Sequence, residues 1–339
     1  MEVGQASEGD TPLDRTPSGT RDVLPDEMRE LRTISGRIRD VFEAAGYGEV
    51  YTPALEHERT FRRVGGGVQP SYRVFDEHGS VLVLRPDVTV PIARLAATRY
   101  AHTEPPLRFC YLEHVYRGVR PQRGESREFL QAGVELLGVA GPAGTAEVLG
   151  VLCGALDAAG LAEYRIGVGD ATLHPTLLDA FGVSAHRRDA ILGELAAGDF
   201  VGADREIHAL GLAPSEADLL LRVVRTRGGP EILEGQPPAL HDALAGLRET
   251  HALLQPATAA RLIFDLGLVR SLGYYTGAVF EVYDPGHGMP LGGGGRYDQL
   301  LASFGRQLPA VGFALDVERV HIAVAGEERG RPRASGDGG

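Results

Sequence analysis

The chain has 339 residues, of which 43% are hydrophobic and 24% are charged, as is typical of a soluble globular protein. No apolar run approaches the roughly 18 residues that a membrane-spanning helix needs, and the opening residues lack a signal-peptide pattern. The net charge of −12 argues against a dedicated nucleic-acid surface, because phosphate contacts need clustered cations. Membrane proteins and dedicated nucleic-acid-binding proteins are therefore disfavoured.

The cysteines and histidines indicate neither a disulfide nor a metal site. Cys110 and Cys153 both lie in apolar stretches, which predicts buried free thiols in a reducing cytoplasm. The histidines between residues 171 and 259 are scattered, without the paired spacing of metal ligands. We therefore expect no metal, no cofactor and a cytoplasmic location.

The N-terminal part of the chain predicts a disordered segment and then a helix. Residues 1–16 are rich in Gly, Ser, Thr and acidic side chains and favour disorder. Apolar residues recur at helical spacing from Met28 to Phe42, and Pro25 lies near the start of the pattern. A short strand over residues 49–52 follows this helix.

A hairpin and a helix come next. Residues 72–75 and 81–84 flank a turn sequence and predict two paired strands. Asp87 and Thr89 precede a helix expected from about residue 90 to residue 100. Asp87 has the character of a helix N-cap, which alone would explain its presence.

The predicted strand over residues 127–138 has an unusual pattern. Strands are also expected at 108–112 and 113–119, before a connecting loop. In the strand 127–138, alternation places Gln131 and Glu135 on one face with otherwise small or apolar neighbours. That face either meets solvent or forms part of a binding site.

The middle of the chain is helix-rich and carries no catalytic constellation. A helix is predicted over 145–161 and a strand over 164–168, and strand 261–266 closes the region. Between them, residues 171–259 have Leu and Ala at helical spacing. Breaks are expected at Gly182, Gly211 and Gly229-Pro230.

The most informative stretch is residues 268–298. Residues 274–283 predict a strand, 285–288 a turn, and Gly292 to Gly295 a backbone that approaches a ligand or another strand closely. Arg270 precedes this strand, and Arg296 and Asp298 follow the glycines. Cations beside a glycine platform suit a small anionic or zwitterionic ligand, although a tight hairpin would also explain the glycines.

Six segments, in chain order, resemble the motifs of histidyl-tRNA synthetase. They are PSGTRDVLP (17–25), YTPALE (51–56), LRPDVTVPIAR (84–94), YRGVRPQRGESREFLQAGVELLG (116–138), LVRSLGYYTG with GGGGRYD (within 268–298) and PAVGFALDVERV (309–320). The resemblance extends over residues 17–323. It implies an α+β fold: a class II aminoacyl-tRNA synthetase-like antiparallel sheet flanked by helices, with a helical insertion domain.

The resemblance also implies a division of the chain and a set of binding residues. Residues 17–170 and 260–323 would form the catalytic-core domain and 171–259 the helical insertion, with 324–339 a disordered tail. The family's histidine pocket maps onto residues of matching type. They are Asp87, Thr89, Arg117, Gln131, Glu135, Arg270, Tyr274 and Tyr275.

Four departures fall on the ATP side of the family's site. Val119 replaces a glutamate that contacts adenine, Glu125 stands where a second arginine is usual, and Asp316 replaces a glycine. The usual aspartate is absent from Ser271-Leu272-Gly273, and we expect no anticodon-binding domain. Like charges about 4 Å apart cost roughly 1 to 4 kcal/mol, so ATP affinity and adenylate formation should be lost.

A retained histidine pocket beside a damaged nucleotide site resembles the regulatory subunit family of ATP phosphoribosyltransferase. That resemblance implies a non-catalytic regulator of the first step of L-histidine biosynthesis, with L-histidine as its feedback effector. The partners it implies are a short-form catalytic subunit and a second copy, paired through the helix, strand and proline of residues 25–53. It implies no tRNA and no membrane. The alternatives are an active short histidyl-tRNA synthetase and a module that binds tRNA-like structures.

Overall fold

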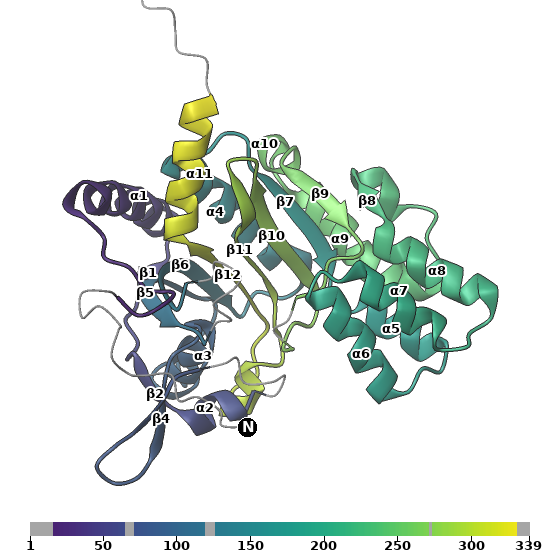
Figure 1. Cartoon of the computed structure of the whole chain (residues 1–339), viewed down its shortest axis with the longest axis horizontal. Helices are drawn as coiled ribbons and strands as arrows, with labels where there is room; N and C mark the ends of the chain where they lie inside the picture. Colours follow the sequence, from purple (N-terminus) through teal and green to yellow (C-terminus); the bar gives the residue numbers. More distant parts are fainter. Residues whose placement is uncertain (1–15, 65–70, 119–125, 271–272, 331–339) are drawn as a thin grey trace, which may run out of the picture.

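The structure is a computed structural model, and it describes residues 16–64, 71–118, 126–270 and 273–330 (Figure 1). Within these residues a nine-stranded sheet has the order β1-β5-β6-β12-β11-β10-β7-β9-β8. Its strands are β1 (Gly48–Glu49), β5 (Leu107–Tyr116), β6 (Glu128–Leu137), β7 (Arg165–Asp170), β8 (Arg227–Gly228), β9 (Leu262–Asp265), β10 (Ala278–Asp284), β11 (His287–Arg296) and β12 (Ala310–Asp316).

The central strands pair antiparallel, from β5 through β6, β12, β11 and β10 to β7. The pairs β1–β5 and β7–β9, nearer the two edges, are parallel. The expected antiparallel sheet flanked by helices is thus confirmed, with parallel pairs added at its margins.

One face of the sheet is covered by α1 (Pro25–Ala44), α4 (Gly141–Ala159), α9 (His241–Leu253) and α11 (Val317–Gly330). Helix α1 starts with Pro25 and two acidic residues in its first turn, where negative charge favours the helix dipole. Its buried residues Leu31, Ile34, Ile38 and Phe42 recur at helical spacing. They pack with Val134 and Leu136 of β6, so apolar side chains fill the space between α1 and this part of the sheet.

The opposite face meets a smaller layer. A three-stranded sheet, β2-β4-β3, is formed by β2 (Leu55–His57), β4 (Val81–Leu84) and β3 (Arg73–Phe75) among the described residues. With it lie α2 (Glu58–Arg62), α3 (Thr89–Thr98) and the 3-10 helix η4 (Leu301–Phe304). Ile92 of α3 packs with Phe109 and Tyr111 of β5 in a second apolar cluster. The pairing of β3 with β4 confirms the predicted hairpin.

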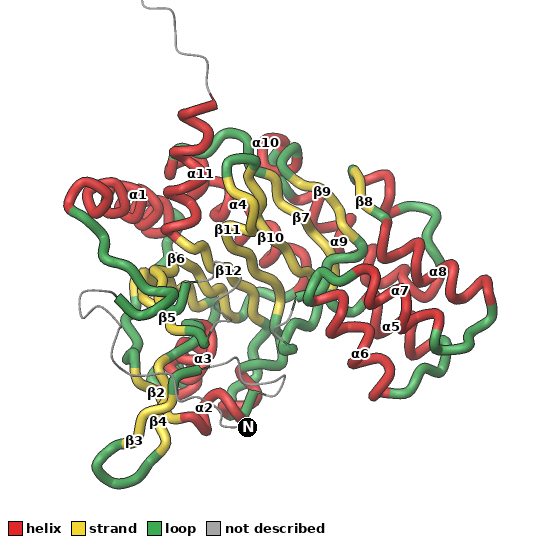
Figure 2. The backbone as a smooth tube through the Cα atoms, viewed as in Figure 1, coloured by secondary structure: helices red, strands yellow, loops and turns green. Residues whose placement is uncertain are grey.

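A group of helices lies beside the sheet, next to the β8–β9 end (Figure 2). It contains α5 (Leu173–Ala180), α6 (Ala185–Ala196), α7 (Phe200–His208) and α8 (Pro214–Arg225), and the short α10 (Pro256–Ala259) follows α9. Gly182 and Gly211 adopt φ of 68° and 69° just after α5 and α7, at two of the expected breaks. The segment 171–259 is thus largely helical, while its standing as a separate domain stays a prediction. No helix in the described part of the chain is long and apolar enough to cross a membrane.

Three expectations about local structure were wrong. Helix α11 continues to Gly330, although 324–339 was expected to be disordered. Glu327 explains this extension, because its carboxylate accepts hydrogen bonds from the backbone N–H groups of Ala162 and Glu163. Strand β5 runs unbroken where two strands were expected, and β10 begins at Ala278, so Tyr274 lies in a turn before it.

Candidate functional site

The face of the sheet away from α1 and α4 is lined by unusually small residues at its centre. Directly paired residues of antiparallel strands share a face. One row across the strands therefore reads Tyr111, Gly133, Ala314, Gly293 and Glu281. The side chains at the two ends of the row are large and polar, and the three between them are small. This row forms a trough in the sheet.

A cavity of about 370 Å³ lies over this trough, within the range of about 300 to 1,000 Å³ usual for small-molecule sites. It is lined by residues of α3, β6, β10, β11, β12 and α11 and of the segments that follow β5 and precede β10. Seven of the eight predicted binding residues line it: Asp87, Thr89, Arg117, Gln131, Arg270, Tyr274 and Tyr275. The eighth, Glu135, lies beneath this surface and is only 1% exposed.

Four glycines leave room for polar side chains that come from other strands or loops. A Cβ atom at Gly133 would come within 3.0 Å of Tyr111 Oη, and one at Gly312 within 3.0 Å of Glu135 Oε2. The same holds for Gly293 with Arg270 Nη1 and for Gly295 with the ring of Tyr275. We call these four pairs the glycine floor. Within the run 292–295, Gly293 and Gly295 make room for side chains, whereas Cβ atoms at Gly292 and Gly294 would meet the backbone of the neighbouring strand β12. The predicted close approach of another strand is thus confirmed at these two positions.

Glu135 is the buried acid of the site. Thr89 Oγ1 donates a hydrogen bond of 2.6 Å to Glu135 Oε1, and the Tyr297 hydroxyl donates to Oε2. Burial raises the pKa of Glu135 from 4.5 to about 8, and the two donated hydrogen bonds only partly oppose that effect. Glu135 therefore tends to carry a proton at neutral pH in the free protein.

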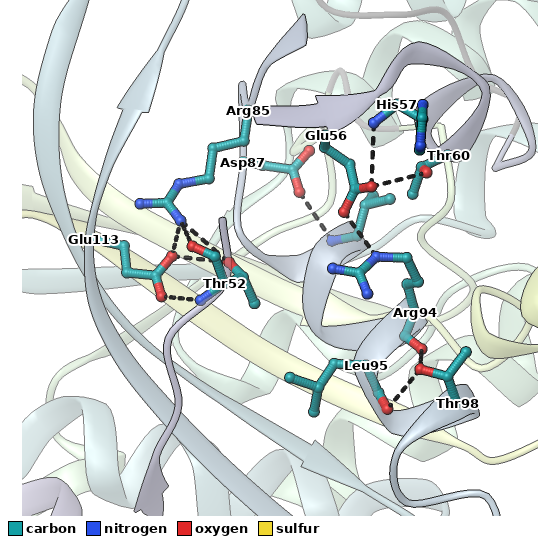
Figure 3. A network of polar contacts seen from close by, with 11 residues as sticks. Thr52, Glu56, His57, Thr60, Arg85, Asp87, Arg94, Leu95, Thr98 and Glu113 are labelled. Atoms are coloured by element: carbon teal, nitrogen blue, oxygen red, sulfur yellow. Dashed lines mark hydrogen bonds and ion pairs between the residues drawn. The ribbon is translucent and has the colours of Figure 1, made fainter. Parts of the chain in front are cut away.

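Asp87 lies beside a buried polar network at the start of α3 (Figure 3). Its Oδ1 accepts a 3.0 Å hydrogen bond from Val90 N, so the predicted capping role is present. Two residues earlier, Arg85 forms a buried ion pair with Glu113, and Glu113 also accepts hydrogen bonds from Thr52. Burial raises the pKa of Asp87, whose carboxylate has no ion-pair partner among the described residues.

Arg117 lines the cavity close to Asp87. Its Nε donates a 2.9 Å hydrogen bond to the backbone oxygen of Pro86, and its guanidinium lies 5.0 Å from the centre of the Phe129 ring. Burial lowers the pKa of Arg117, while the nearby carboxylate of Asp87 raises it. The Pro86 contact thus fixes Arg117 close to the acid that it stabilises.

Two other arginines of the cavity are already paired with carboxylates. Asp316 Oδ2 lies 3.1 Å from Arg319 Nε, and Asp316 Oδ1 accepts a hydrogen bond from Arg319 N at the start of α11. Arg270 Nη1 lies 2.9 Å from Glu281 Oε1. Arg319 also donates to the backbone oxygen of Pro290, at 2.7 Å. Neither cation is a free charge for an incoming anion.

Some residues singled out in the sequence lie elsewhere. Arg296 pairs with Asp298 and donates to the backbone oxygen of Gly141, so it stabilises the fold outside the cavity. Val119, Glu125, Ser271 and Leu272 lie outside the described residues. Tyr111 and Tyr297 were not predicted as residues of the site, although Tyr297 stands inside the GGGGRYD motif.

The remaining candidates are structural. Within the described ranges, no group of His, Cys, Asp and Glu could hold a metal ion. Cys110 and Cys153 are free and buried, as predicted. Burial lowers the pKa of His174 to about 4, so it is a neutral core histidine.

Comparison with known proteins identifies the family. The sequence model of the histidyl-tRNA synthetase family matches residues 19–320. An ATP phosphoribosyltransferase regulatory subunit of Symbiobacterium thermophilum is 41% identical, over 92% of this chain and 81% of that protein. One of Desulforamulus reducens is 38% identical, over 91% and 79%. The chain belongs to the ATP phosphoribosyltransferase regulatory subunit family, which has a histidyl-tRNA synthetase-like fold.

Solved structures agree with that family and fold. A protein of Bacillus halodurans described as an ATP phosphoribosyltransferase regulatory subunit/histidyl-tRNA synthetase superposes with a TM-score of 0.84 at 33% identity. The match covers 93% of this chain and 84% of that one. Histidyl-tRNA synthetase from Nostoc, at 21% identity and a TM-score of 0.74, shares the fold. These structures thus confirm the class II synthetase-like core that was predicted from the motifs.

Proposed function

We propose that this chain is the regulatory subunit of a short-form ATP phosphoribosyltransferase and that it senses free L-histidine in the cavity over the glycine floor. It would assemble with the catalytic subunit in the cytoplasm and relay feedback inhibition of the first step of histidine biosynthesis. The relatives' names support the assembly. The arrangement of charges in the cavity supports the ligand.

Histidine carries three groups that a site must recognise, and the cavity has a suitable group for each. Asp87, a buried carboxylate without an ion-pair partner among the described residues, suits the ammonium group. Arg117 suits the carboxylate. Gln131, with Glu135 beneath it, suits the imidazole nitrogens. The assignment of these contacts is part of the proposal.

The observation that carries the regulatory role is the state of Arg319. Activation of an amino acid by ATP requires cations that clamp the phosphates. Arg319 is instead paired with Asp316 on the same wall of the cavity. We infer that this protein binds histidine without converting it to the adenylate, and that it carries no catalytic activity of its own.

Histidine binding must then be linked to the state of the assembly. The effector has to bind one arrangement of the hetero-oligomer better than another, with a coupling of about 1 to 3 kcal/mol in typical systems. We also propose a homodimer through α1 and the β1 segment that follows it. Exposed apolar side chains next to that segment, Tyr51 and Leu55, support this pairing.

The test combines calorimetry with assays of the reconstituted enzyme. The purified chain should bind L-histidine, and the complex with its catalytic subunit should be inhibited by it. Tyr274→Ala and Glu135→Ala should abolish binding and inhibition while assembly remains intact. Unchanged inhibition in folded, assembled variants would remove the sensor assignment.

A short histidyl-tRNA synthetase is the second candidate. The family model and the retained Arg117, Arg270 and Arg319 favour it. Histidine-dependent exchange of pyrophosphate into ATP distinguishes the two functions. Robust exchange by the purified chain would establish the synthetase, and its absence together with histidine binding would support the regulator.

A further inference from the structure

Tyr111 is a fully buried side chain with an unusual hydroxyl. The residue is 0% exposed, and its Oη atom has no hydrogen-bond partner among the described residues. Buried tyrosine hydroxyls are usually paired, since an unpaired polar group loses its hydration without compensation. Tyr164, equally buried, shows the usual arrangement, because its hydroxyl donates to Asp157 Oδ1 at 2.8 Å.

The Tyr111 hydroxyl lies next to the cavity, although Tyr111 and Gly133 themselves are not among the residues that line it. Tyr111 pairs with Gly133 across β5 and β6, and the end of its ring lies directly over that glycine. Gly133 in turn pairs with Ala314 of β12, which lines the cavity, and stands between Gln131 and Glu135 on the same face. The hydroxyl therefore covers a glycine whose neighbours Gln131 and Ala314 belong to the cavity lining.

Tyr111 lies near two buried polar residues of the site, Glu135 and Tyr297, which are 1% and 2% exposed. Two pairs of opposite charge, Arg319 with Asp316 and Arg270 with Glu281, also line the cavity. Burial, reinforced by Glu135 and Asp87, raises the pKa of Tyr111 well above its usual value, so its hydroxyl is neutral and can donate as well as accept.

We propose that the Tyr111 hydroxyl forms a hydrogen bond with a ring nitrogen of the bound amino acid and thereby selects an imidazole side chain. With its ammonium group at Asp87 and its carboxylate at Arg117, as proposed above, a zwitterionic ligand can turn its side chain toward Glu135 and Tyr111. A neutral imidazole has one donor and one acceptor nitrogen, and a hydroxyl can satisfy either. This inference rests on the proposed function, since it specifies how the same cavity reads histidine.

The Tyr111→Phe variant tests the proposal because it removes one oxygen atom and keeps the ring over Gly133. Calorimetry should show histidine binding weakened about tenfold, the loss expected for one buried hydrogen bond. The ligand-free variant should unfold at the same temperature as the wild type or a higher one, because no intramolecular hydrogen bond is lost. Tyr164→Phe is the matched control, and it should lower the unfolding temperature while histidine affinity stays unchanged.

A second ligand tests whether Tyr111 contacts the imidazole ring or the carboxylate of histidine. L-Histidinol keeps the imidazole and the ammonium but lacks the carboxylate, so Tyr111→Phe should weaken its binding by the same factor. Three results would each overturn the role of Tyr111. The variant could bind histidine as tightly as the wild type, it could lose affinity for histidine but not for histidinol, or it could be less stable than the wild type without ligand. If the wild type bound no histidine, the proposed function would fail as well, whereas wild-type binding with an unaffected variant would remove only this inference.

Discussion

The acids and the arginines of the cavity differ in how their charges are paired. Asp87 and Glu135, which form the acid-lined part, are buried and have no cation paired with them among the described residues. Arg319 and Arg270, which form the arginine-lined part, are each held by a carboxylate of the chain itself. Under the proposed function, Asp87 is left for the ammonium group of an amino acid, while arginines that already have counter-ions attract phosphate weakly. A synthetase-like fold would then bind one of the two substrates and not the other.

The largest effect is expected from a substitution that disturbs the acid-lined part. Gly312→Ala would place a methyl group against Glu135 Oε2 and the backbone oxygen of Val134. We expect a loss of about 1 to 3 kcal/mol in the free energy of unfolding and no measurable histidine binding. Denaturant unfolding and calorimetry would measure both. Gly288→Ala, in the same sheet with nothing within 4 Å of the new methyl group, should change neither.

A smaller change removes only one charge. Asp87→Asn keeps an oxygen for Val90 N and deletes the partner proposed for the ligand's ammonium group. Histidine binding should weaken about 10- to 100-fold, the range of a lost charge-assisted hydrogen bond. Asp170→Asn is a matched control, because that buried carboxylate binds Thr172 and lies outside the cavity. Equal effects of the two variants would contradict the assignment of Asp87.

The acid-lined part also predicts a dependence of stability on pH. The pKa of Glu135 is raised from 4.5 to about 8, so between these values the folded protein keeps a proton that the unfolded chain releases. Stability should therefore fall as pH rises through this window, by up to about 1.4 kcal/mol per pH unit. Glu135→Gln should lack this contribution. Urea unfolding at pH 5 and pH 7.5 should show that the stability of the variant relative to the wild type is greater at pH 7.5. The same difference in unfolding free energy at both pH values would contradict the raised pKa.

The arginine-lined part gives the smallest expected effect. Asp316→Asn keeps an acceptor for Arg319 N but releases the guanidinium charge. ATP binding should improve about five- to tenfold, since an ion pair near a surface is worth about 1 kcal/mol. Nucleotide titration would measure this gain. Asp298→Asn, which releases Arg296 outside the cavity, should leave ATP binding unchanged.

The sequence predicted much of the fold because its signals are local. Apolar spacing from Met28 to Phe42 gave α1, and alternation in residues 127–138 gave β6 with Gln131 and Glu135 on one face. The extension of α11 could not be predicted, because it depends on contacts between Glu327 and a loop far away in the chain.

The composition of the cavity was predictable only in part, for a similar reason. Tyr111 sits in an ordinary apolar strand, and only the register of β5 against β6 places it over Gly133. Arg296 is a cation directly after the glycines, as a ligand-binding residue would be, yet the pairing of β11 turns it toward Gly141. Register is a property of two strands, so neither residue could be assigned from its own segment.

The glycine floor has a consequence for how this protein can change. At each of its glycines a Cβ atom would meet two obstacles, a side chain such as Tyr111 at Gly133 or Arg270 at Gly293 and a backbone oxygen of a neighbouring strand. A smaller partner side chain would leave the backbone oxygen in place, so it could not make room for a larger residue at the glycine. New ligand preferences should therefore arise at the side chains around the floor, and related chains that bind a different molecule should keep the glycines.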